Sequence, residues 1–399
     1  MAIDNKDKKI LNVPHLRFPE FSGEWEMVSL QDIATINPKS DPLQNTFVYI
    51  DLEAVEKGEL RKIQEIMREE APSRAQRVID NNDILFQCVR PYQKNNYIHR
   101  ILNTSNQQWV ASTGYAQIRT TELPNYIYHL LNTDEFNRKV MVRCTGSSYP
   151  AINSEDLATI HLYYTPDKKE QLKISRLLDL LDKRIATQNK IIEDLKKLKS
   201  AISKQVFAQK PNGWNRLDTL FSKGKAGGTP TSTNKEYYNG EIPFLSINDI
   251  TKQGKYVRYT ENHLSQSGLE NSSAWMVPEY SLIMSMYASV GLVTINEIPI
   301  TTSQAMFAMQ LKDKDLLDYL YYYLSYFKYR YIHKYLETGT QSNINADIVR
   351  GIMIPTYGHS RNMEIASTLQ GFDAKIDNEL SVLELFNRQK NYLLSQMFI

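Results

Sequence analysis

Cysteine is scarce in this chain, and long hydrophobic runs are missing. Cys88 and Cys144 are the only two cysteines among 399 residues. Such a pair excludes a disulfide framework and a cysteine-based zinc site, and it fits a reducing compartment. No run approaches 18 apolar residues, so no membrane span is expected. Residues 1–13 are polar and lack the apolar core of a secretory signal, which predicts a disordered leader on a cytoplasmic protein.

Catalytic motifs are missing as well. An amino-methyltransferase needs an Asn/Asp-Pro-Pro-Tyr/Phe motif, and neither Asn37-Pro38-Lys39 nor Asp41-Pro42-Leu43 completes it. The stretch Gly224-Lys225-Ala226-Gly227-Gly228 lacks the Gly-Lys-Ser/Thr end of a phosphate-binding loop, so we interpret it as a flexible loop. The seven histidines form no i, i+4 pair, which gives no metal-ligand pattern. We therefore expect no catalytic residue and no metal ligand.

The chain also lacks a large excess of positive or negative charge. The formal net charge is only +2, a small value for a nucleic-acid-binding protein. The distribution is uneven, however, because residues 168–204 carry eleven Lys or Arg against five Asp or Glu. That segment is either a solvated helix face or a basic rod that lies near phosphates.

What the chain does contain is a duplication, with copies about 191 residues apart. Each copy ends in an amphipathic segment whose apolar residues recur at spacings of three and four, which predicts a long helix with a heptad seam. The expected interface residues of the helix pair are Leu178, Leu181, Ile185, Ile192, Leu195 and Ile202 in the first copy, and Leu369, Phe372, Ile376, Leu383, Phe386 and Leu393 in the second.

The duplication predicts an α+β fold with a pseudo-two-fold, circular arrangement. We expect two repeated globular domains, separated by two long helices that pack as an antiparallel coiled coil. The predicted boundaries are 14–166 for the first domain, 167–210 for the first helix, 211–358 for the second domain and 359–399 for the second helix. The turn signal Pro211-Asn212-Gly213 marks the middle boundary. On this topology the C-terminal residues 397–399 return to the first domain, close to Trp25.

Polar residues interrupt the heptad seam at matching places in the two copies. Gln188 corresponds to Glu379, and Lys199 corresponds to Lys390. If these residues face one another across an antiparallel pair, opposite charges would meet and fix the alignment.

Within each copy, short strands precede a helical stretch, a polar loop and a last strand. Strands are predicted at 46–52 and 83–86 in the first copy, and at 242–247 and 281–284 in the second. Helical stretches are predicted at 125–137 and 316–335. Polar Thr-Gly loops follow at 145–150 and 338–342.

These landmarks resemble the specificity (S) subunit of type I restriction–modification systems. The resemblance covers nearly the whole chain. It rests on Leu16-Arg17-Phe18-Pro19 with Trp25, on Gly228-Thr229-Pro230-Thr231, on the two Thr-Gly loops, and on the helix start from Pro166 through Glu170-Gln171 to Asp182. The second copy departs from this start, with Arg361 and Asn362 in place of Glu170 and Gln171.

The resemblance implies a DNA sequence-recognition subunit that is not itself an enzyme. Each globular domain would be a target recognition domain that reads one half of a bipartite DNA target in the major groove. The helix pair would set the gap and dock two methyltransferase subunits of an adenine-N6 DNA methyltransferase complex. Motor-nuclease subunits would complete the restriction endonuclease. No cofactor is expected in this chain, whereas S-adenosylmethionine, ATP and Mg²⁺ are expected on the partner subunits.

Side chains that offer hydrogen bonds to base edges are the candidates for contact with double-stranded DNA. Arg90 ranks first, because it follows a short strand that can aim a side chain. The candidates in the first domain are Arg68, Arg74, Gln76, Arg90, Tyr92, Lys94, Ser147, Ser148 and Tyr149. Those in the second are Lys225, Thr229, Thr231, Tyr287, Gln304, Thr340, Gln341 and Ser342.

Two other interpretations stay open at this stage. The chain could be a coiled-coil scaffold that joins protein partners without reading DNA. It could also be a duplicated enzyme with an unrecognised site, which an assay of the isolated chain with DNA, Mg²⁺ and S-adenosylmethionine would test.

Overall fold

The computed structural model describes residues 12–100, 107–336 and 343–399. The chain divides into two compact units. Unit 1 is formed by two separate stretches of the chain, and each unit contains part of both long helices. Unit 1 comprises residues 1–189 and 381–399, and unit 2 comprises residues 190–380. Both junctions fall inside a long helix. They also fall at matching places, because 190 and 381 are again 191 residues apart.

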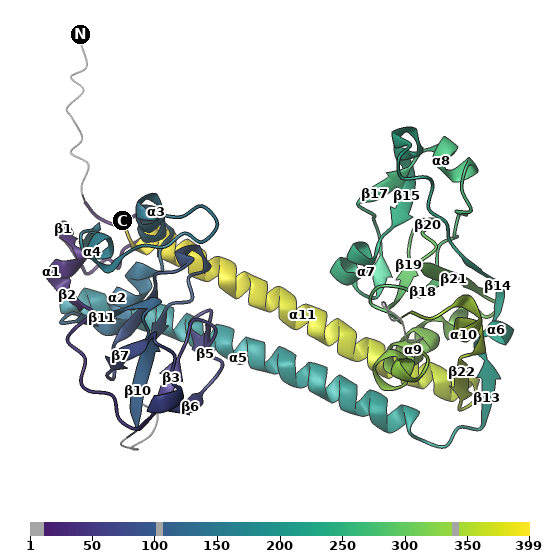
Figure 1. The fold of residues 1–399 in the computed structure, drawn as a ribbon, viewed down its shortest axis with the longest axis horizontal. Coiled ribbons are helices and arrows are strands. Elements are labelled where there is room, and N and C mark those ends of the chain that lie inside the picture. Colours follow the sequence, from purple (N-terminus) through teal and green to yellow (C-terminus); the bar gives the residue numbers. More distant parts are fainter. Residues whose placement is uncertain (1–11, 101–106, 337–342) are drawn as a thin grey trace, which may run out of the picture. The chain divides into compact units, whose positions relative to one another are not determined.

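Unit 1 is built around two four-stranded sheets (Figure 1). One sheet has the strand order β6-β3-β10-β7 and the other β2-β11-β8-β9, while β1 pairs with β12. The strands are β1 Glu26–Ser29, β2 Ala34–Ile36, β3 Thr46–Ile50, β4 Val55–Glu56, β5 Glu59–Leu60, β6 Gln64–Met67, β7 Ala75–Ile79, β8 Ile84–Gln87, β9 Tyr97–Ile98, β10 Gln108–Ser112, β11 Tyr115–Thr120 and β12 His161–Tyr164. The helices are α1 Leu30–Ile33, α2 Pro124–Leu131, α3 Asp134–Arg143, α4 Ser154–Ala158 and the first part of α5 Lys168–Phe207.

Unit 2 has a five-stranded sheet of order β14-β21-β18-β19-β16 and a three-stranded sheet of order β17-β15-β20. Its strands are β13 Gly213–Arg216, β14 Phe221–Ala226, β15 Tyr238–Leu245, β16 Tyr256–Val257, β17 Asn262–Leu264, β18 Leu282–Ser285, β19 Val293–Asn296, β20 Thr301–Thr302, β21 Met306–Leu311 and β22 Met353–Thr356. Its helices are α6 Leu217–Leu220, α7 Ile247–Gln253, α8 Gln266–Glu270, α9 Leu317–Arg330, α10 Ala346–Gly351, the end of α5 and the first part of α11 His359–Met397.

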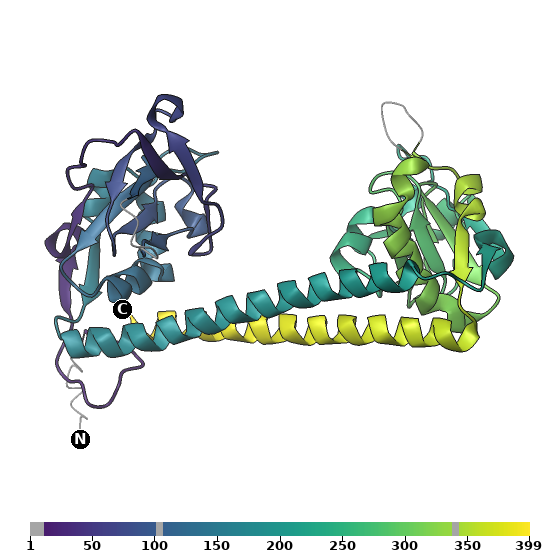
Figure 2. The same cartoon turned by 90° about the horizontal axis from the view of Figure 1, so that it is seen from below.

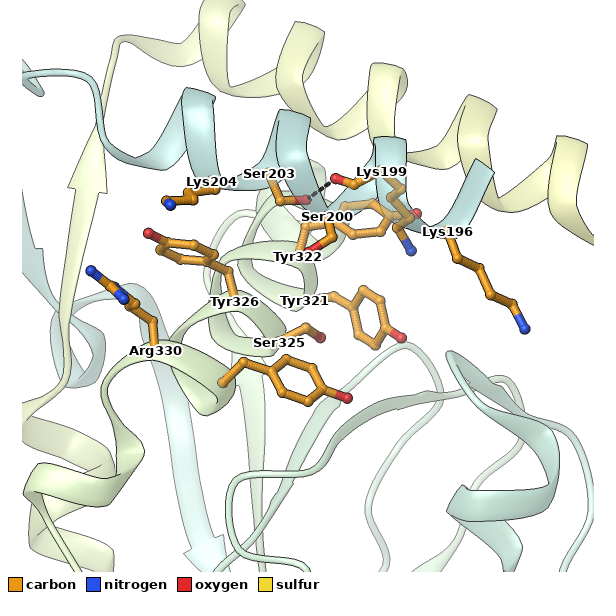
Figure 3. A pocket seen from close by; sticks show the side chains of 11 residues that line it. Lys196, Lys199, Ser200, Ser203, Lys204, Tyr321, Tyr322, Ser325, Tyr326 and Arg330 are labelled. Atoms are coloured by element: carbon orange, nitrogen blue, oxygen red, sulfur yellow. Dashed lines mark hydrogen bonds between the residues drawn. The ribbon is translucent and has the colours of Figure 1, made fainter. Parts of the chain in front are cut away.

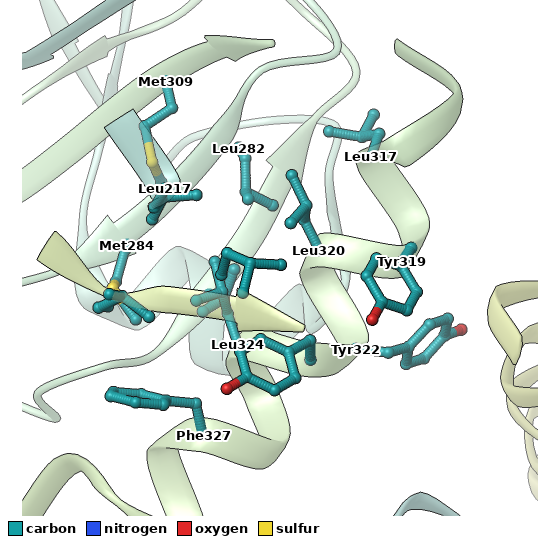
Figure 4. Close-up of a cluster of buried hydrophobic side chains, with 14 of the residues drawn as sticks. Leu217, Leu282, Met284, Met309, Leu317, Tyr319, Leu320, Tyr322, Leu324 and Phe327 are labelled. Atoms are coloured by element: carbon teal, nitrogen blue, oxygen red, sulfur yellow. The ribbon is translucent and has the colours of Figure 1, made fainter. Parts of the chain in front are cut away.

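The tyrosine-rich helix α9 supplies one wall of the main core of unit 2. Leu320 and Leu324 are fully buried against Leu282 of β18 and Met309 of β21 (Figure 4). Tyr319, Tyr322 and Tyr323 are also almost fully buried, and their hydroxyl groups are satisfied by hydrogen bonds. Burial of rings with a bonded hydroxyl favours the helix over any exposed role for these three tyrosines.

The predicted helical stretch of unit 1 was wrong in one respect, because it is two helices rather than one. Helix α2 ends at Leu131 and α3 begins at Asp134. Thr133 caps α3 by accepting a hydrogen bond from the Phe136 amide through its hydroxyl group. A threonine bonded to the backbone in this way begins a new helix rather than continuing the previous one. The corresponding α9 of unit 2 continues without a break to Arg330.

The long helices α5 and α11 pack together, as predicted (Figure 2). In unit 1, Ile174 and Leu178 of α5 share a core with Leu394 and Met397 of α11. Further along, the Arg184 guanidinium lies 5.8 Å from the centre of the Phe386 ring. The residue numbers rise along α5 while they fall along α11, so the packing is antiparallel. In unit 2, Ile202 of α5 packs against the core that contains Leu369 of α11.

The polar residues of the seam pair differently from the sequence expectation. Lys199 forms an ion pair with Asp373 in unit 2, and the Lys390 ammonium lies 2.5 Å from the Asp182 carboxylate in unit 1. Both lysines therefore meet aspartates. Glu379 forms an ion pair with Lys375, one turn away on its own helix. The two Lys–Asp pairs are related by the same offset of 191 residues.

The family-like landmark Leu16-Arg17-Phe18-Pro19 has a structural role. The Arg17 guanidinium donates two hydrogen bonds to Glu170, at 2.7 and 2.9 Å, and this bonding raises the pKa of Arg17. The Glu170 side chain is only 1% exposed, so the guanidinium compensates a buried carboxylate at the start of α5. The C-terminus also returns to this unit, as expected, with the Phe398 ring 6.1 Å from that of Trp25.

Candidate nucleic-acid interface

A cleft of about 750 Å³ opens in unit 1 at the end of strand β8. It brings together three of the predicted residues, Arg74, Arg90 and Tyr149, which are far apart in the sequence. Its full lining is Leu52, Glu53, Val55, Glu56, Arg61, Arg74, Gln87, Val89, Arg90, Gln93, Asn95 and Tyr149. A volume of this size, with convergent polar groups, is typical of a binding site.

Arg90 is held in an unusual backbone conformation at this cleft. Its φ of 54° and ψ of 54° place it in the left-handed region, which costs free energy for a residue with a side chain. The Arg90 amide donates a 2.8 Å hydrogen bond to the Pro150 carbonyl, and the guanidinium lies 4.3 Å from the centre of the Tyr149 ring. These contacts fix the strand end to the Thr-Gly loop and aim the guanidinium across the cleft.

The loop that carries Tyr149 is closed on itself. Thr145 and Ala151 exchange two backbone hydrogen bonds of 2.9 Å, and Gly146 takes a φ of 89°. An added side chain at Gly146 would lie only 3.0 Å from the Tyr149 carbonyl oxygen. The loop is thus a compact platform, and Ser147, Ser148 and Tyr149 are all exposed on it.

An amide network of Gln87, Gln93 and Asn95 lines the same cleft, and the sequence reasoning missed Gln87 and Asn95. The Gln87 side chain donates a 2.9 Å hydrogen bond to Gln93, and its carbonyl oxygen accepts from the Asn95 amide at 3.1 Å. Carboxamides read adenine through paired donor and acceptor groups. Arg61 was missed as well. Its guanidinium forms ion pairs with the carboxylates of Glu59, at 2.7 Å, and Glu56, at 3.5 Å. The polar run after a buried strand, residues 87–96, is the signal that would have drawn attention to these amides.

The other predicted residues of unit 1 lie in different surroundings. Arg68 donates to the Leu43 carbonyl at 3.2 Å, and Gln76 donates to the Ser73 carbonyl at 2.5 Å. Tyr92 is 51% exposed. The Lys94 ammonium is already engaged within the domain, 2.5 Å from Asp134 and 3.1 Å from the Asn132 carbonyl. Lys94 therefore fastens the loop to helix α3.

The predicted residues of unit 2 that the structure describes lie near the equivalent end of the five-stranded sheet. Strands β14 and β18 end there and β21 begins there, because β21 runs antiparallel to both. The Thr229 hydroxyl donates to the Gln304 side chain at 2.5 Å, and the Met286 amide, next to Tyr287, donates to the Ala305 carbonyl at 2.7 Å. Lys225, Thr231 and Tyr287 are exposed. Thr340, Gln341 and Ser342 lie outside the described residues.

The glycine-rich stretch is not the flexible loop that we expected. A Cβ atom added to Gly227 would lie 1.9 Å from the Thr302 carbonyl oxygen, and one added to Gly228 would lie 2.1 Å from the Ser273 hydroxyl. These glycines allow the backbone to pack closely against its neighbours. They thereby fix the position of Thr229 at the edge of the sheet.

No cluster of three or more metal-ligating side chains is found within the described ranges. Likewise, none of the helices in the described part of the chain is long and apolar enough to cross a membrane. Both cysteines are free thiols, and burial raises the pKa of Cys88 to about 12.

Comparison with known proteins identifies the family. The model of the type I restriction modification DNA specificity domain matches residues 22–197 and again residues 211–384. The chain therefore belongs to this family, and it contains two copies of the domain. It is a DNA specificity subunit of a type I restriction–modification system, and such a subunit is the non-catalytic part of the restriction enzyme.

Individual relatives agree with this assignment. The chain is 21% identical to the type I restriction enzyme HindI specificity subunit of Haemophilus influenzae over 380 residues, which cover 75% of this chain and 78% of the relative. It is 26% identical to the MjaIX specificity subunit of Methanocaldococcus jannaschii over 178 residues, or 43% of this chain and 40% of that one.

Solved structures show the same fold. The S subunit of the type I system of M. genitalium has a TM-score of 0.58 and 14% identity, with 97% of this chain and 99% of that chain covered. A chain from a study of complex assembly and conformational transition of the type I R-M system has a TM-score of 0.62 and 22% identity, with 94% and 97% covered.

Proposed function

We propose that this chain reads a two-part DNA sequence, one half with each target recognition domain. Residues 14–166 and 211–358 would form these domains, and residues 167–210 and 359–399 the spacer between them. The observation that supports the proposal is the equivalent position of the two polar edges. Arg90 follows β8 and Tyr287 follows β18, which are equivalent strands in their sheets.

The cleft of unit 1 has the chemistry that base reading requires. Arg90 offers a planar fork that suits the two acceptors of guanine, and Gln93 offers a carboxamide that suits adenine. Arg74 and the serines of the Thr-Gly loop would contact phosphates and fix the register. In unit 2, Lys225, Thr229, Thr231 and Tyr287 would act in the same way on the other half of the site.

The paired helices α5 and α11 would set the gap between the two half-sites and dock two methyltransferase subunits. Their seam would comprise the twelve apolar residues predicted from the heptads, and the burial of these residues, all buried or half-buried, supports this. S-adenosylmethionine, ATP and Mg²⁺ would be bound by the methyltransferase and motor-nuclease partners. Such a complex would act on double-stranded DNA in the cytoplasm.

Sequencing of methylated sites tests the proposal in cells that carry this chain with its methyltransferase. We expect one split motif with a fixed gap. A continuous motif, or no motif that depends on this chain, would contradict it and favour a scaffold that joins proteins without reading DNA.

The spacer function has its own test, an insertion of seven residues after Asn189 and of seven more after Leu380. One heptad in each helix keeps the seam in register and adds about 10 Å. With base pairs about 3.4 Å apart, the gap should grow by roughly three base pairs. An insertion in one helix only is the control, and it should disrupt the pairing. If the methyltransferase directed by the chain with both insertions still methylates sites with the original gap, the helices do not set the gap.

A further inference from the structure

A second cavity lies wholly within unit 2, between helix α5 and helix α9, away from the sheet edge described above. It has a volume of about 360 Å³, which is within the usual range for a small ligand. Serine, lysine, arginine and tyrosine form its whole lining, and none of the lining residues is acidic. This composition is unusual beside α5, where carboxylates are interspersed with lysines.

Three cations of the lining are available to a ligand. Lys196, Lys204 and Arg330 are exposed, and within the described ranges none of their side chains has a hydrogen bond or an ion pair. Figure 3 shows Lys204 and Arg330 close to Tyr326 at one end of the cavity, with Lys196 at the opposite end beyond Tyr321. Unpaired cations in a shared cavity attract an anion, because no acidic side chain is among its lining residues.

One carboxylate, Asp373, contacts two of the lining residues. It accepts a 2.6 Å hydrogen bond from the Tyr322 hydroxyl and forms an ion pair with Lys199. The Lys199 ammonium also lies 5.1 Å from the centre of the Tyr322 ring. Burial, together with Asp373, raises the pKa of Tyr322, so this ring carries no charge near neutral pH. Lys199 and Asp373 thus balance each other's charge, and the three unpaired cations of the lining remain for a ligand.

Aromatic rings form the remaining wall. Tyr321 and Tyr326 line the cavity from α9, and burial raises the pKa of both hydroxyl groups, so they too stay neutral. Tyr329 also lines it and is 84% exposed, so its ring is free to stack on a ligand. Stacking on tyrosine suits a nucleobase, since every base has a π-face.

From this arrangement we propose that the cavity binds a nucleotide, with the phosphate held by Lys204 and Arg330 and the base stacked on the tyrosines. Lysine binds phosphate as a point charge, and the planar guanidinium of arginine can pair with two phosphate oxygens; the lining has three lysines and one arginine. The nucleotide could be a free mononucleotide or one unit of a single strand, since both present the same groups. The site is separate from the residues proposed to read the DNA target.

Binding of three probes to the purified full chain tests the proposal by calorimetry. The probes are inorganic phosphate, AMP and the tetranucleotide d(A)4. We expect AMP to bind more tightly than phosphate, because only AMP adds a stacked base. A higher affinity for d(A)4 than for AMP would identify a strand as the natural source, and equal affinity would identify a free nucleotide.

Substitutions in the cavity test which side chains bind the phosphate and which bind the base. Lys204→Ala with Arg330→Ala should weaken AMP and phosphate binding by at least about tenfold, because two charge-assisted contacts are lost. Tyr329→Ala should weaken AMP binding by roughly tenfold and leave phosphate binding unchanged. The matched control is Lys190→Ala with Lys314→Ala, which removes two exposed charges of unit 2 that do not line the cavity. This control should bind all three probes normally.

Several outcomes would overturn the proposal. They are no binding of AMP at millimolar concentration, an equal loss in the control, and an unchanged affinity in the Lys204/Arg330 variant. An acidic peptide that competes as well as AMP would assign the cavity to a protein partner instead. Because the probes carry no target sequence, failure here leaves the proposed reading of a split DNA motif untouched, and methylation sites can be mapped on the same variants.

Discussion

The two ends of the helix pair have the same architecture but different chemistry. Residue by residue, Ser203, Val206 and Phe207 of α5 correspond to Leu394, Met397 and Phe398 of α11. In unit 1 the larger apolar side chains are buried in the domain core, beside Phe136 and Trp25. In unit 2 the smaller Ser203 lines an open cavity. Lys196 and Lys204 likewise correspond to Asn387 and Ser395. The two copies thus share the same helix packing, but Ser203 lines a cavity in unit 2, whereas the corresponding Leu394 fills the core in unit 1.

The largest expected effect comes from Phe398→Ala compared with Phe207→Ala. Both rings are buried, at 6% and 7% exposure, so each truncation should cost about 3–5 kcal/mol in its own unit. Hydrogen exchange followed by mass spectrometry would report each unit separately, which a single melting curve cannot do. Equal loss of protection in both units after either change would mean that the units do not unfold independently.

A second difference between the units should appear as pH dependence. His99 of unit 1 is fully buried, and neither ring nitrogen has a partner within the described residues; burial lowers its pKa to about 4. Asn296 takes the equivalent place in unit 2, and its side chain donates to the carbonyls of Pro278 and Ile298.

Because the folded pKa of His99 is lowered, its neutral form stabilises unit 1 above the unfolded pKa of about 6.5. That stability is lost as the pH falls from about 6.5 towards 4, by on the order of 2 kcal/mol. Hydrogen exchange at pH 7 and at pH 5 should show weaker protection in unit 1 only. In His99→Asn the difference between the two pH values should shrink. Equal weakening of unit 2 would assign the effect to other groups.

The next effect separates the two recognition edges. Arg90→Ala should cost about 1–3 kcal/mol at one base position of one half-site, and the other half-site should be read normally. Arg90→Lys keeps the charge but loses the paired contact, so it should also relax that position. Binding to a panel of singly substituted duplexes measures this. Uniform weakening across the panel would instead indicate a phosphate contact.

The smallest effect concerns the two Lys–Asp pairs of the helix seam. A double-mutant cycle on Lys390 and Asp182 should give a coupling of about 0.5–1 kcal/mol, since both side chains are partly exposed. The Lys199–Asp373 pair should couple more strongly, because Asp373 also accepts a hydrogen bond from Tyr322. The order of the two couplings, measured in each unit by hydrogen exchange at low salt, is the informative result. The reverse order would contradict the charge balance between Lys199 and Asp373 described beside the cavity.

Much of the fold could be predicted from the sequence, because its signals are periodic and local. The heptads give α5 and α11 nearly to the residue, and the offset of 191 predicts that Phe398 returns to Trp25. The break between α2 and α3 was missed, since Thr133 looks like an ordinary helix residue until its hydroxyl is seen to cap the next helix.

The candidate site was predictable only in part. Arg90 stands out in the sequence because it follows a strand and precedes a proline. Its grouping with Arg74 and Tyr149 depends on tertiary contacts that join three distant segments. For the same reason the sequence could not reveal that Lys94 is bound to Asp134, or that Gly227 packs against Thr302.

The discontinuity of unit 1 has a consequence for synthesis on the ribosome. Its core is completed by Leu394, Met397 and Phe398, which are made last. The whole of unit 2, residues 190–380, emerges in between. At about 5–20 residues per second, the nascent first domain waits roughly 10–40 s with an unfilled apolar groove. Unit 2 can fold during this interval. Because the apolar groove of the first domain stays exposed until the last residues are made, we expect chaperones to bind this domain while the chain is being synthesised.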